Sequence, residues 1–463
     1  MMLYRALRRV ARVALHWYYA DVTTEGREQL PPGGPLLLVA NHPNALVDAM
    51  LVSVAVPRRV LLTAKATLFE QPILAAALRG VGVVPLRRAR DEPDAGSAPA
   101  SSASRNADAF RMVTRALADG GAVLVFPEGI SHDAPAIAPL RTGAARMALM
   151  AHDAGVALRV AAVGLIYEEK ERPRSRVLVR IGEPLDVARW LASRGPDVAA
   201  LTAEIERRLR RVTLNFASAD RARRAVQLAR TLDAVVSEAP PLDRPRPLAV
   251  EADLARRVDA ASDALAVAPA SVVQRADAFI AQSEALERQL AAHGIALTEL
   301  RVSPRMRHGA QFVIREAAGL LLALPVALAD HVAHDLPVRL ARAIARRSLA
   351  ADPSRDQPAM RTILLATSLL LVWYLTIGLA LDHWLGFGVA VATIGVMLLS
   401  ASTELALRDQ ISRAWCRARS YLALRAHPDI RATALAEADR LLEEARALEL
   451  ALQAGARNAT EMR

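Results

Sequence analysis

Residues 36–48 of the chain read LLLVANHPNALVD. The apolar run Leu36–Ala40 is typical of a buried strand, and the Pro and Asn that follow are typical of a corner before a helix, where loops commonly present catalytic groups. A neutral imidazole at such a corner can accept a hydroxyl proton, and a carboxylate can hold that imidazole in one tautomer. His42 and Asp48 could form this pair, although a structural histidine beside a capping Asn44 explains these residues alone equally well.

Short apolar runs alternate with helical patterns from residue 24 to about residue 190. This order predicts an α/β domain with a mostly buried sheet over residues 21–190, interrupted by a polar loop at Asp91–Ser104. We expect strands at Leu36–Ala40, Val60–Ala64, Val81–Leu86, Ala122–Phe126, Leu158–Ile166 and Val177–Ile181, and helices between them at Ala109–Ala118 and Thr142–Ala154.

Two further motifs follow expected strand ends. VPLRRARD at residues 84–91 places Arg87 and Arg88 where a guanidinium could hold a phosphate through two parallel hydrogen bonds. FPEGISH at residues 126–132 enters a tight turn, in which Gly129 permits close backbone approach and Glu128 could bond a ligand hydroxyl or orient a basic group. The alternative for the arginine motif is a solvated strand end, since the whole chain is rich in arginine. The alternative for the Glu-Gly motif is a plain turn with a surface glutamate.

The three motifs together resemble the glycerolipid acyltransferase family, which contains glycerol-3-phosphate and lysophosphatidate acyltransferases. NHPNALVD is similar to its His-and-Asp motif, VPLRRARD to its arginine motif and FPEGIS to its Glu-Gly motif, and the order and spacing also agree. LRTGAARMAL at residues 140–149, VGLIY at 163–167 and IGEP at 181–184 extend the resemblance over about residues 20–190. It implies an α/β acyltransferase fold and a thioester donor, acyl-CoA or acyl carrier protein.

The sequence departs from the family pattern at three places. Five residues separate His42 from Asp48 instead of four, which resembles the branch containing fungal-type glycerol-3-phosphate acyltransferases. Ser131 stands where the Glu-Gly motif often continues with Arg, and Ala162 stands where Pro often precedes Val-Gly. The serine weakens any expected phosphate contact from that loop, whereas the alanine should affect backbone shape more than chemistry.

The resemblance implies His42 as general base and Asp48 as the residue that orients it. We expect the acceptor to be glycerol 3-phosphate, with lysophosphatidate, another lysolipid or an amino-acid lipid precursor as alternatives. We expect neither a metal ion nor a redox cofactor. A catalytically silent membrane scaffold is the rival from another class. The expected substrate-binding residues are Asn41, Arg87, Arg88, Glu128, Gly129 and Ser131, with Arg88 as the preferred phosphate ligand.

The charge of the chain indicates an anionic partner. Its formal net charge is +11, which favours either nucleic acid or an anionic membrane surface. No basic run is interleaved with aromatic residues, so we expect no nucleic-acid binding. The single cysteine, Cys416, excludes a disulfide within the chain and a Cys/His metal cluster, and it places the soluble parts in a reducing compartment.

Several segments indicate a membrane protein. Residues 1–20 predict an amphipathic helix rather than a signal peptide, because arginines interrupt their apolar residues. Thr362–Leu381 and Leu385–Thr403 carry no charge, and the short link Asp382-His383-Trp384 between them predicts a transmembrane hairpin over residues 362–403. Arginines on both flanks predict that both are cytoplasmic. We therefore expect an integral protein of a bacterial inner membrane with its catalytic domain on the cytoplasmic face.

The remaining segments are expected to be mostly helical. Residues 191–310 have a helical, charged pattern with a proline-rich linker near residues 240–247. Residues 311–345 are apolar but interrupted by charges, which predicts an interfacial, re-entrant or packed segment. Residues 404–463 form a basic tail with a helical pattern.

Overall fold

The computed structural model describes residues 2–65, 83–86, 107–236, 246–301, 358–400 and 403–461, with scattered residues between 314 and 347. The expected loop Asp91–Ser104 lies outside the described residues. The chain divides into two compact units. Unit 1 comprises residues 1–215 and 341–367, and unit 2 comprises residues 216–340 and 368–463.

Unit 1 is built on one eight-stranded sheet with the order β1-β7-β6-β2-β5-β3-β4, in which β8 pairs with β6. Strands β6, β2, β5, β3 and β4 run parallel, whereas β7 and β8 are antiparallel to β6, and β1 is parallel to β7. The strands are β1 (Asp21–Glu25), β2 (Leu36–Ala40), β3 (Val60–Lys65), β4 (Val84–Leu86), β5 (Ala122–Val125), β6 (Arg159–Tyr167), β7 (Arg176–Ile181) and β8 (Leu185–Asp186).

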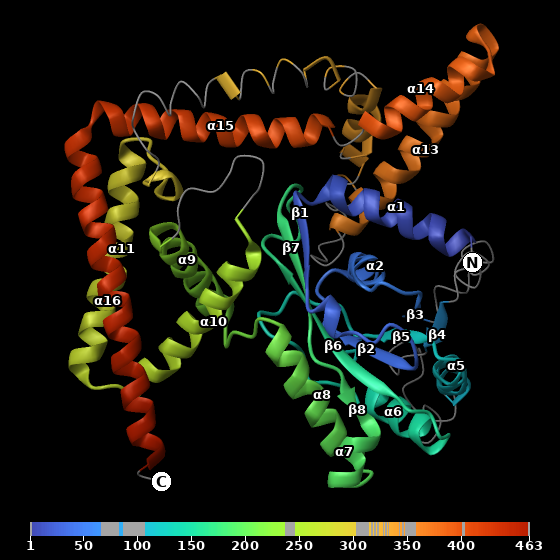
Figure 1. Cartoon of the computed structure of the whole chain (residues 1–463), viewed down its shortest axis with the longest axis horizontal. Coiled ribbons are helices and arrows are strands. Elements are labelled where there is room, and N and C mark those ends of the chain that lie inside the picture. The colour runs from blue at the N-terminus through green and yellow to red at the C-terminus, as the bar shows by residue number, and fades with distance from the viewer. Residues whose placement is uncertain are drawn as a thin grey trace. The chain divides into compact units, whose positions relative to one another are not determined.

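The expected α/β domain with a mostly buried sheet is confirmed. All five residues of β2 are buried, because helices cover both faces of the sheet. Leu36 and Leu38 contact one core, and Leu37 and Val39 contact the other, as the alternation of side chains along a strand requires. Helices α1 (Met2–Tyr18) and α2 (Ala45–Ala55) lie on the first face, and α5 (Ala107–Ala118), α6 (Gly143–Asp153), α7 (Val187–Arg194) and α8 (Val198–Val212) lie on the second (Figure 1).

Two later parts of the chain also belong to unit 1. Helix α7 extends past residue 190, where the recognisable motifs end, and α8 lies wholly beyond it, yet their apolar residues Leu191, Leu201 and Leu209 pack on the sheet. Gly164 of β6 lies so close to α8 that an added Cβ atom would be 2.0 Å from the Val212 carbonyl oxygen. Ile363, from the return segment 341–367, is buried in the core that contains α1 and α2.

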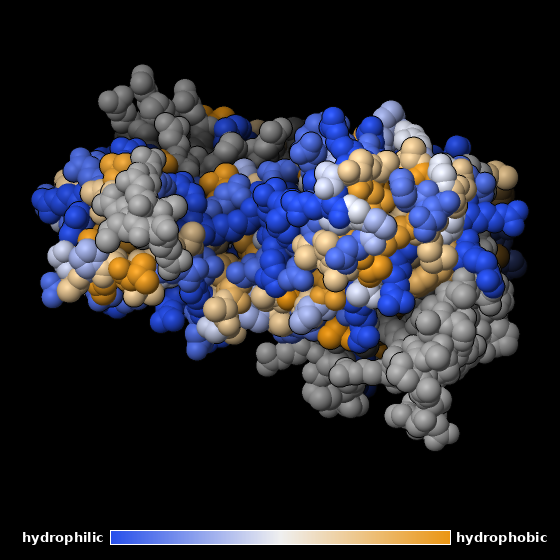
Figure 2. Space-filling view, turned by 90° about the horizontal axis from the view of Figure 1, so that it is seen from below, coloured by the Kyte–Doolittle hydropathy of each residue, from blue (hydrophilic) through white to orange (hydrophobic). Residues whose placement is uncertain are grey.

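Unit 2 contains a bundle of long helices, which agrees with the helical region expected after the catalytic domain. Its core is formed by apolar residues of α9, α11, α15 and α16, among them Phe279, Leu290 and Leu441. The helices are α9 (Ala219–Val236), α10 (Leu248–Leu265), α11 (Ala270–Ala292), α15 (Thr403–Ala426) and α16 (Pro428–Glu461). Hydrophilic and apolar side chains are interspersed on the face of the molecule in Figure 2.

The expected transmembrane hairpin is confirmed only in part. Within the described residues, the segment Met360–Leu385 of α13 (Pro358–Leu385) alone is long and apolar enough to cross a membrane. Helix α14 (Phe387–Ser400) has 14 residues, which at about 1.5 Å per residue is shorter than a bilayer core of about 30 Å. The two helices fold back on each other, since an added Cβ atom on Gly378 would lie 3.9 Å from Ile394 (Figure 1).

The position of the expected link is wrong. Asp382-His383-Trp384 remain helical at the end of α13, and the break falls at Gly386. Gly386 has φ +87°, a left-handed conformation that ends helices and that glycine adopts without steric cost. Polar residues at a helix end do not by themselves stop the helix, so the glycine was the better signal.

Candidate active site

The candidate site lies where the parallel strands end. Because β2, β5 and β6 run parallel and in register, the residues that follow them meet at one edge of the sheet. This edge brings together His42, Glu128 and Tyr167, which are far apart in the sequence. Arg87 and Arg88 follow β4, the parallel strand at the sheet edge beyond β3, but they lie outside the described residues.

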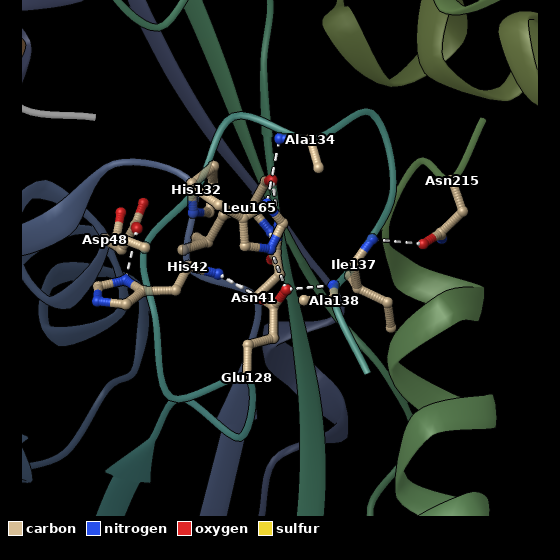
Figure 3. Close-up of polar contacts among 12 residues, drawn as sticks. Asn41, His42, Asp48, Glu128, His132, Ala134, Ile137, Ala138, Leu165 and Asn215 are labelled. Atoms are coloured by element: carbon tan, nitrogen blue, oxygen red, sulfur yellow. Dashed lines mark hydrogen bonds and ion pairs between the residues drawn. The ribbon is translucent and has the colours of Figure 1, made fainter. Parts of the chain in front are cut away.

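His42 and Asp48 form the expected pair. Nδ1 of His42 lies 2.9 Å from Oδ2 of Asp48, which is fully buried in the first turn of α2 (Figure 3). The imidazole stacks on Phe126, with ring centroids 3.8 Å apart and planes 12° from parallel. Within the described residues Nε2 has no bonded partner, and 11% of the side chain is exposed. The ring is therefore fixed on one side and available to a substrate proton on the other.

The Asp48 carboxylate uses both of its oxygens. Oδ2 also accepts a hydrogen bond from the Asn44 backbone N–H at 2.7 Å, and Oδ1 accepts one from the Tyr167 hydroxyl at 2.5 Å. Burial, followed by the negative charge of Asp48, raises the pKa of Tyr167 well above its usual value, so the phenol stays protonated.

The five residues between His42 and Asp48 include Ala45 in an unusual backbone conformation. This residue has φ 46°, a left-handed conformation that costs a non-glycine residue about 1–2 kcal/mol. Its backbone N–H donates to Oγ of Ser131 at 3.2 Å, which holds the turn in this conformation. The longer spacing therefore leaves Asp48 within hydrogen-bonding distance of the imidazole.

Glu128 organises the loops around His42. The side chain is buried, and Oε1 accepts the backbone N–H of His42 at 2.9 Å. Oε2 accepts the backbone N–H of Ala138 at 2.6 Å and is bonded to Nε2 of His132 (Figure 3). Both oxygens are thus bonded to groups of the protein itself.

Three other predicted substrate-binding residues also make contacts within the chain. The Asn41 side chain donates to the Leu165 carbonyl oxygen at 3.1 Å and accepts the Leu165 N–H at 2.7 Å, which continues the pairing of β2 with β6. Gly129 has φ +73°, and an added Cβ atom would lie 2.7 Å from Nε of Arg141. The close approach expected at Gly129 is therefore made by Arg141. Ser131 accepts the Ala45 N–H, as described above.

Sequence reasoning missed two residues at this edge. Tyr167 is the last residue of β6, which ends at the same edge of the sheet as β2. A polar aromatic residue directly after the apolar run VGLI could have marked it as a candidate site residue. Lys170 is one of two lysines among 59 basic residues. Its ammonium donates to the Pro43 carbonyl oxygen at 2.8 Å and lies 2.8 Å from the Asp133 carboxylate, which joins the two site loops. The described residues contain no cluster of three or more metal-ligating side chains.

The geometry agrees with the comparisons to known proteins. Residues 21–164 match the acyltransferase family, and a glycerol-3-phosphate O-acyltransferase 2 of Saccharomyces cerevisiae is 42% identical over 84 residues. The domain belongs to the glycerolipid acyltransferase family. The 84 matched residues are 18% of this chain and 11% of the yeast protein. An uncharacterized acyltransferase of Schizosaccharomyces pombe is 24% identical over 38% of this chain and 38% of its own.

The matches to these relatives cover only part of each protein. This chain spans 38% or less of the length of the curated relatives named here. Among solved structures, the 1-acyl-sn-glycerophosphate (LPA) acyltransferase PlsC from Thermotoga maritima is similar, with 21% identity and a TM-score of 0.35. That match covers 45% of this chain and 78% of the Thermotoga chain.

Proposed function

We propose that the protein transfers a fatty acyl group from a thioester donor, acyl-CoA or acyl carrier protein, to a hydroxyl of glycerol 3-phosphate in phospholipid synthesis. The observation that carries the proposal is the pairing of Nδ1 of His42 with the buried Asp48 carboxylate, while Nε2 has no partner among the described residues. This is the arrangement that a general base for a hydroxyl nucleophile requires.

The proposed reaction is a direct transfer. Nε2 of His42 takes the proton from the acceptor hydroxyl as its oxygen attacks the thioester carbonyl carbon. Asp48 stabilises the imidazolium that forms. The tetrahedral intermediate then expels the thiolate as the carbon–sulfur bond breaks, and the thiolate takes the proton from His42. The products are an ester and a free thiol.

Arg88 is proposed as the ligand of the acceptor phosphate. It follows β4, which pairs in parallel with β3, as β3 does with β5, so the chain leaves β4 at the same edge that carries His42. The planar guanidinium can make two parallel bonds to a phosphate. Two yeast relatives named as glycerol-3-phosphate O-acyltransferases, 42% and 32% identical over 84 and 87 residues, support this acceptor.

Membrane association supports the same function, because the product is a lipid. Helix α13 has the length and composition of a membrane span, and the apolar α14 is proposed as the second leg of a hairpin with both flanks in the cytoplasm. Helix α1 exposes Leu3, Leu7 and Val13 among arginines, a composition suited to the surface of an anionic leaflet.

An acceptor panel tests the proposal. Full-length protein in detergent would receive labelled acyl-CoA or acyl carrier protein together with glycerol 3-phosphate, lysophosphatidate or a neutral lysophospholipid. We expect labelled product with glycerol 3-phosphate, and a rate lower by about a hundredfold or more in His42→Ala. Transfer to lysophosphatidate alone would move the acceptor to the second acylation step. Near-normal turnover in folded His42→Ala would refute the mechanism.

Kinetics of arginine variants test the phosphate ligand. Arg88→Ala should raise the acceptor KM by about 30- to 1000-fold, because a charged hydrogen bond is worth on the order of 2–4 kcal/mol, and should leave the donor KM nearly unchanged. Arg88→Lys should recover part of the loss. Arg87→Ala is the matched control, and we expect a much smaller effect from it if the strand pattern continues through both arginines, because neighbouring residues of a strand face opposite sides. If the acceptor KM of all three variants equals that of the unmodified protein, these arginines do not bind a phosphate of the acceptor.

A further inference from the structure

The Asp48 carboxylate has a hydrogen-bond donor that the proposed reaction does not use. His42 and the Asn44 N–H share Oδ2, whereas the Tyr167 hydroxyl alone bonds Oδ1 at 2.5 Å. Tyr167 ends β6, 119 positions after Asp48 in the sequence. The donor therefore comes from β6, whereas His42 and Asp48 follow β2 in the sequence.

The surroundings of Tyr167 hold its hydroxyl in place. Its ring lies against that of Tyr19, with centroids 5.9 Å apart, and Tyr19 is fully buried immediately after α1. The Tyr19 hydroxyl in turn accepts a hydrogen bond from Nδ2 of Asn44 at 3.1 Å. Burial raises the pKa values of both tyrosines, so the Tyr167 phenol keeps its proton and acts as a donor.

We propose that Tyr167 is a positioning residue, which fixes Oδ1 of Asp48 and thereby sets both the orientation and the proton affinity of His42. A donor on a carboxylate spreads the negative charge and weakens its pull on a neighbouring proton. Without the phenol, Asp48 would stabilise protonated His42 more strongly, and its carboxylate would be held through Oδ2 alone. The kinetic consequence rests on the proposed acyl transfer, whereas the effect on His42 protonation does not.

Other charged and titratable groups near His42 are the same in every variant below. Glu128 bonds the His42 N–H, and the His132 N–H bonds the His42 carbonyl oxygen. Lys170 bonds the adjacent Pro43 carbonyl oxygen and pairs with Asp133. A difference between variants therefore reports on the Tyr167–Asp48 bond.

The test compares Tyr167→Phe with Tyr18→Phe. Tyr18 is a matched control because it is also buried at the end of α1 and loses a similar bond, from its hydroxyl to the Glu171 carbonyl oxygen at 2.8 Å, which does not involve Asp48. The rate at which diethyl pyrocarbonate modifies His42 would be followed against pH by peptide mass spectrometry, with melting temperatures as the folding check. The pH at which the His42 modification rate is half of its maximum should rise by about 0.5–1 pH unit in Tyr167→Phe. The same midpoint should stay constant in Tyr18→Phe.

The enzymatic counterpart is a change in the pH profile. The acid limb of kcat/KM should move upward by the same amount in Tyr167→Phe, and kcat should fall about tenfold with both KM values nearly unchanged. Tyr167→Met removes the same donor with a flexible side chain, so either variant decides the question if the other does not fold.

An unchanged midpoint in a folded Tyr167 variant would overturn the inference. Absence of acyl transfer to every acceptor by the unmodified protein would instead refute the proposed function. The modification midpoint would still decide the role of Tyr167, so the two failures are distinguishable.

Discussion

Replacing Glu128 by Gln tests whether this residue acts on the substrate or on the protein. In the structure, its carboxylate accepts the backbone N–H groups of His42 and Ala138 and is bonded to His132. A Gln side chain has nearly the same shape but only one acceptor oxygen. If that oxygen remains on the His42 N–H, the Ala138 N–H faces an amide NH₂ group and loses its acceptor.

The expected cost follows from the burial of Glu128, which is 3% exposed. Leaving a buried donor without an acceptor costs about 1–3 kcal/mol, and replacing a charged acceptor by a neutral one at the second bond costs about 1 kcal/mol more. A total of about 2–4 kcal/mol should lower the melting temperature by at least about 4 °C for a unit of this size. Because the loop that carries His42 loosens, kcat should fall with it.

The assay combines thermal unfolding with steady-state kinetics, and Glu204→Gln is the control. Glu204 lies on α8 and pairs with Arg207 and Arg208 near the surface, so its replacement should cost less than about 1 kcal/mol and leave kcat unchanged. A Glu128→Gln protein with normal melting temperature and normal kcat but a raised acceptor KM would refute the anchoring role. Such a result would indicate that Glu128 binds the acceptor.

Two further predictions concern other parts of the chain. Gly129→Ala should destabilise the protein by about 1–2 kcal/mol because of φ +73° alone, and a clash of the new Cβ atom with Nε of Arg141 should add to this cost. The double variant Gly129→Ala/Arg141→Ala should lose only the clash, which unfolding of the single and double variants would measure. Reporter fusions after Arg361 and at Arg463 should both report the cytoplasm if α13 and α14 form a spanning hairpin, whereas reports from opposite sides would leave α13 as a single span.

Local patterns allowed much of the fold and the central pair to be predicted. The buried strand Leu36–Ala40 and the corner after it follow from apolar runs and turn residues, which made His42 and Asp48 candidates, and the resemblance of three motifs to a known family then favoured them over a structural histidine. Strand β1 was not predicted, because DVTTE is polar and lies at the sheet edge with every residue partly exposed. The two-residue strand β8 is too short to give a pattern.

Contacts between distant strands could not be derived from local patterns. The bond from Tyr167 to Asp48 depends on the register of β2 against β6, which pairs Ala40 with Val163. The engagement of both Glu128 oxygens likewise depends on how two loops pack, so the bonds of this glutamate to the His42 and Ala138 N–H groups could not be foreseen from the sequence. Sequence patterns predict which residues reach an edge, whereas the partner of each is decided by packing.

The return of residues 341–367 to unit 1 has a consequence for work with fragments. Ile363 is buried in the same core as Leu15 and Val52, so a fragment ending at Asn215 lacks part of its own interior and exposes the apolar surface that Ile363 covers. The length of the intervening chain should matter little, because doubling a closed loop costs only about 0.6 kcal/mol. A shortened protein that omits most of residues 216–340 but keeps residues 341–367 on a flexible tether should express better than one truncated at Asn215.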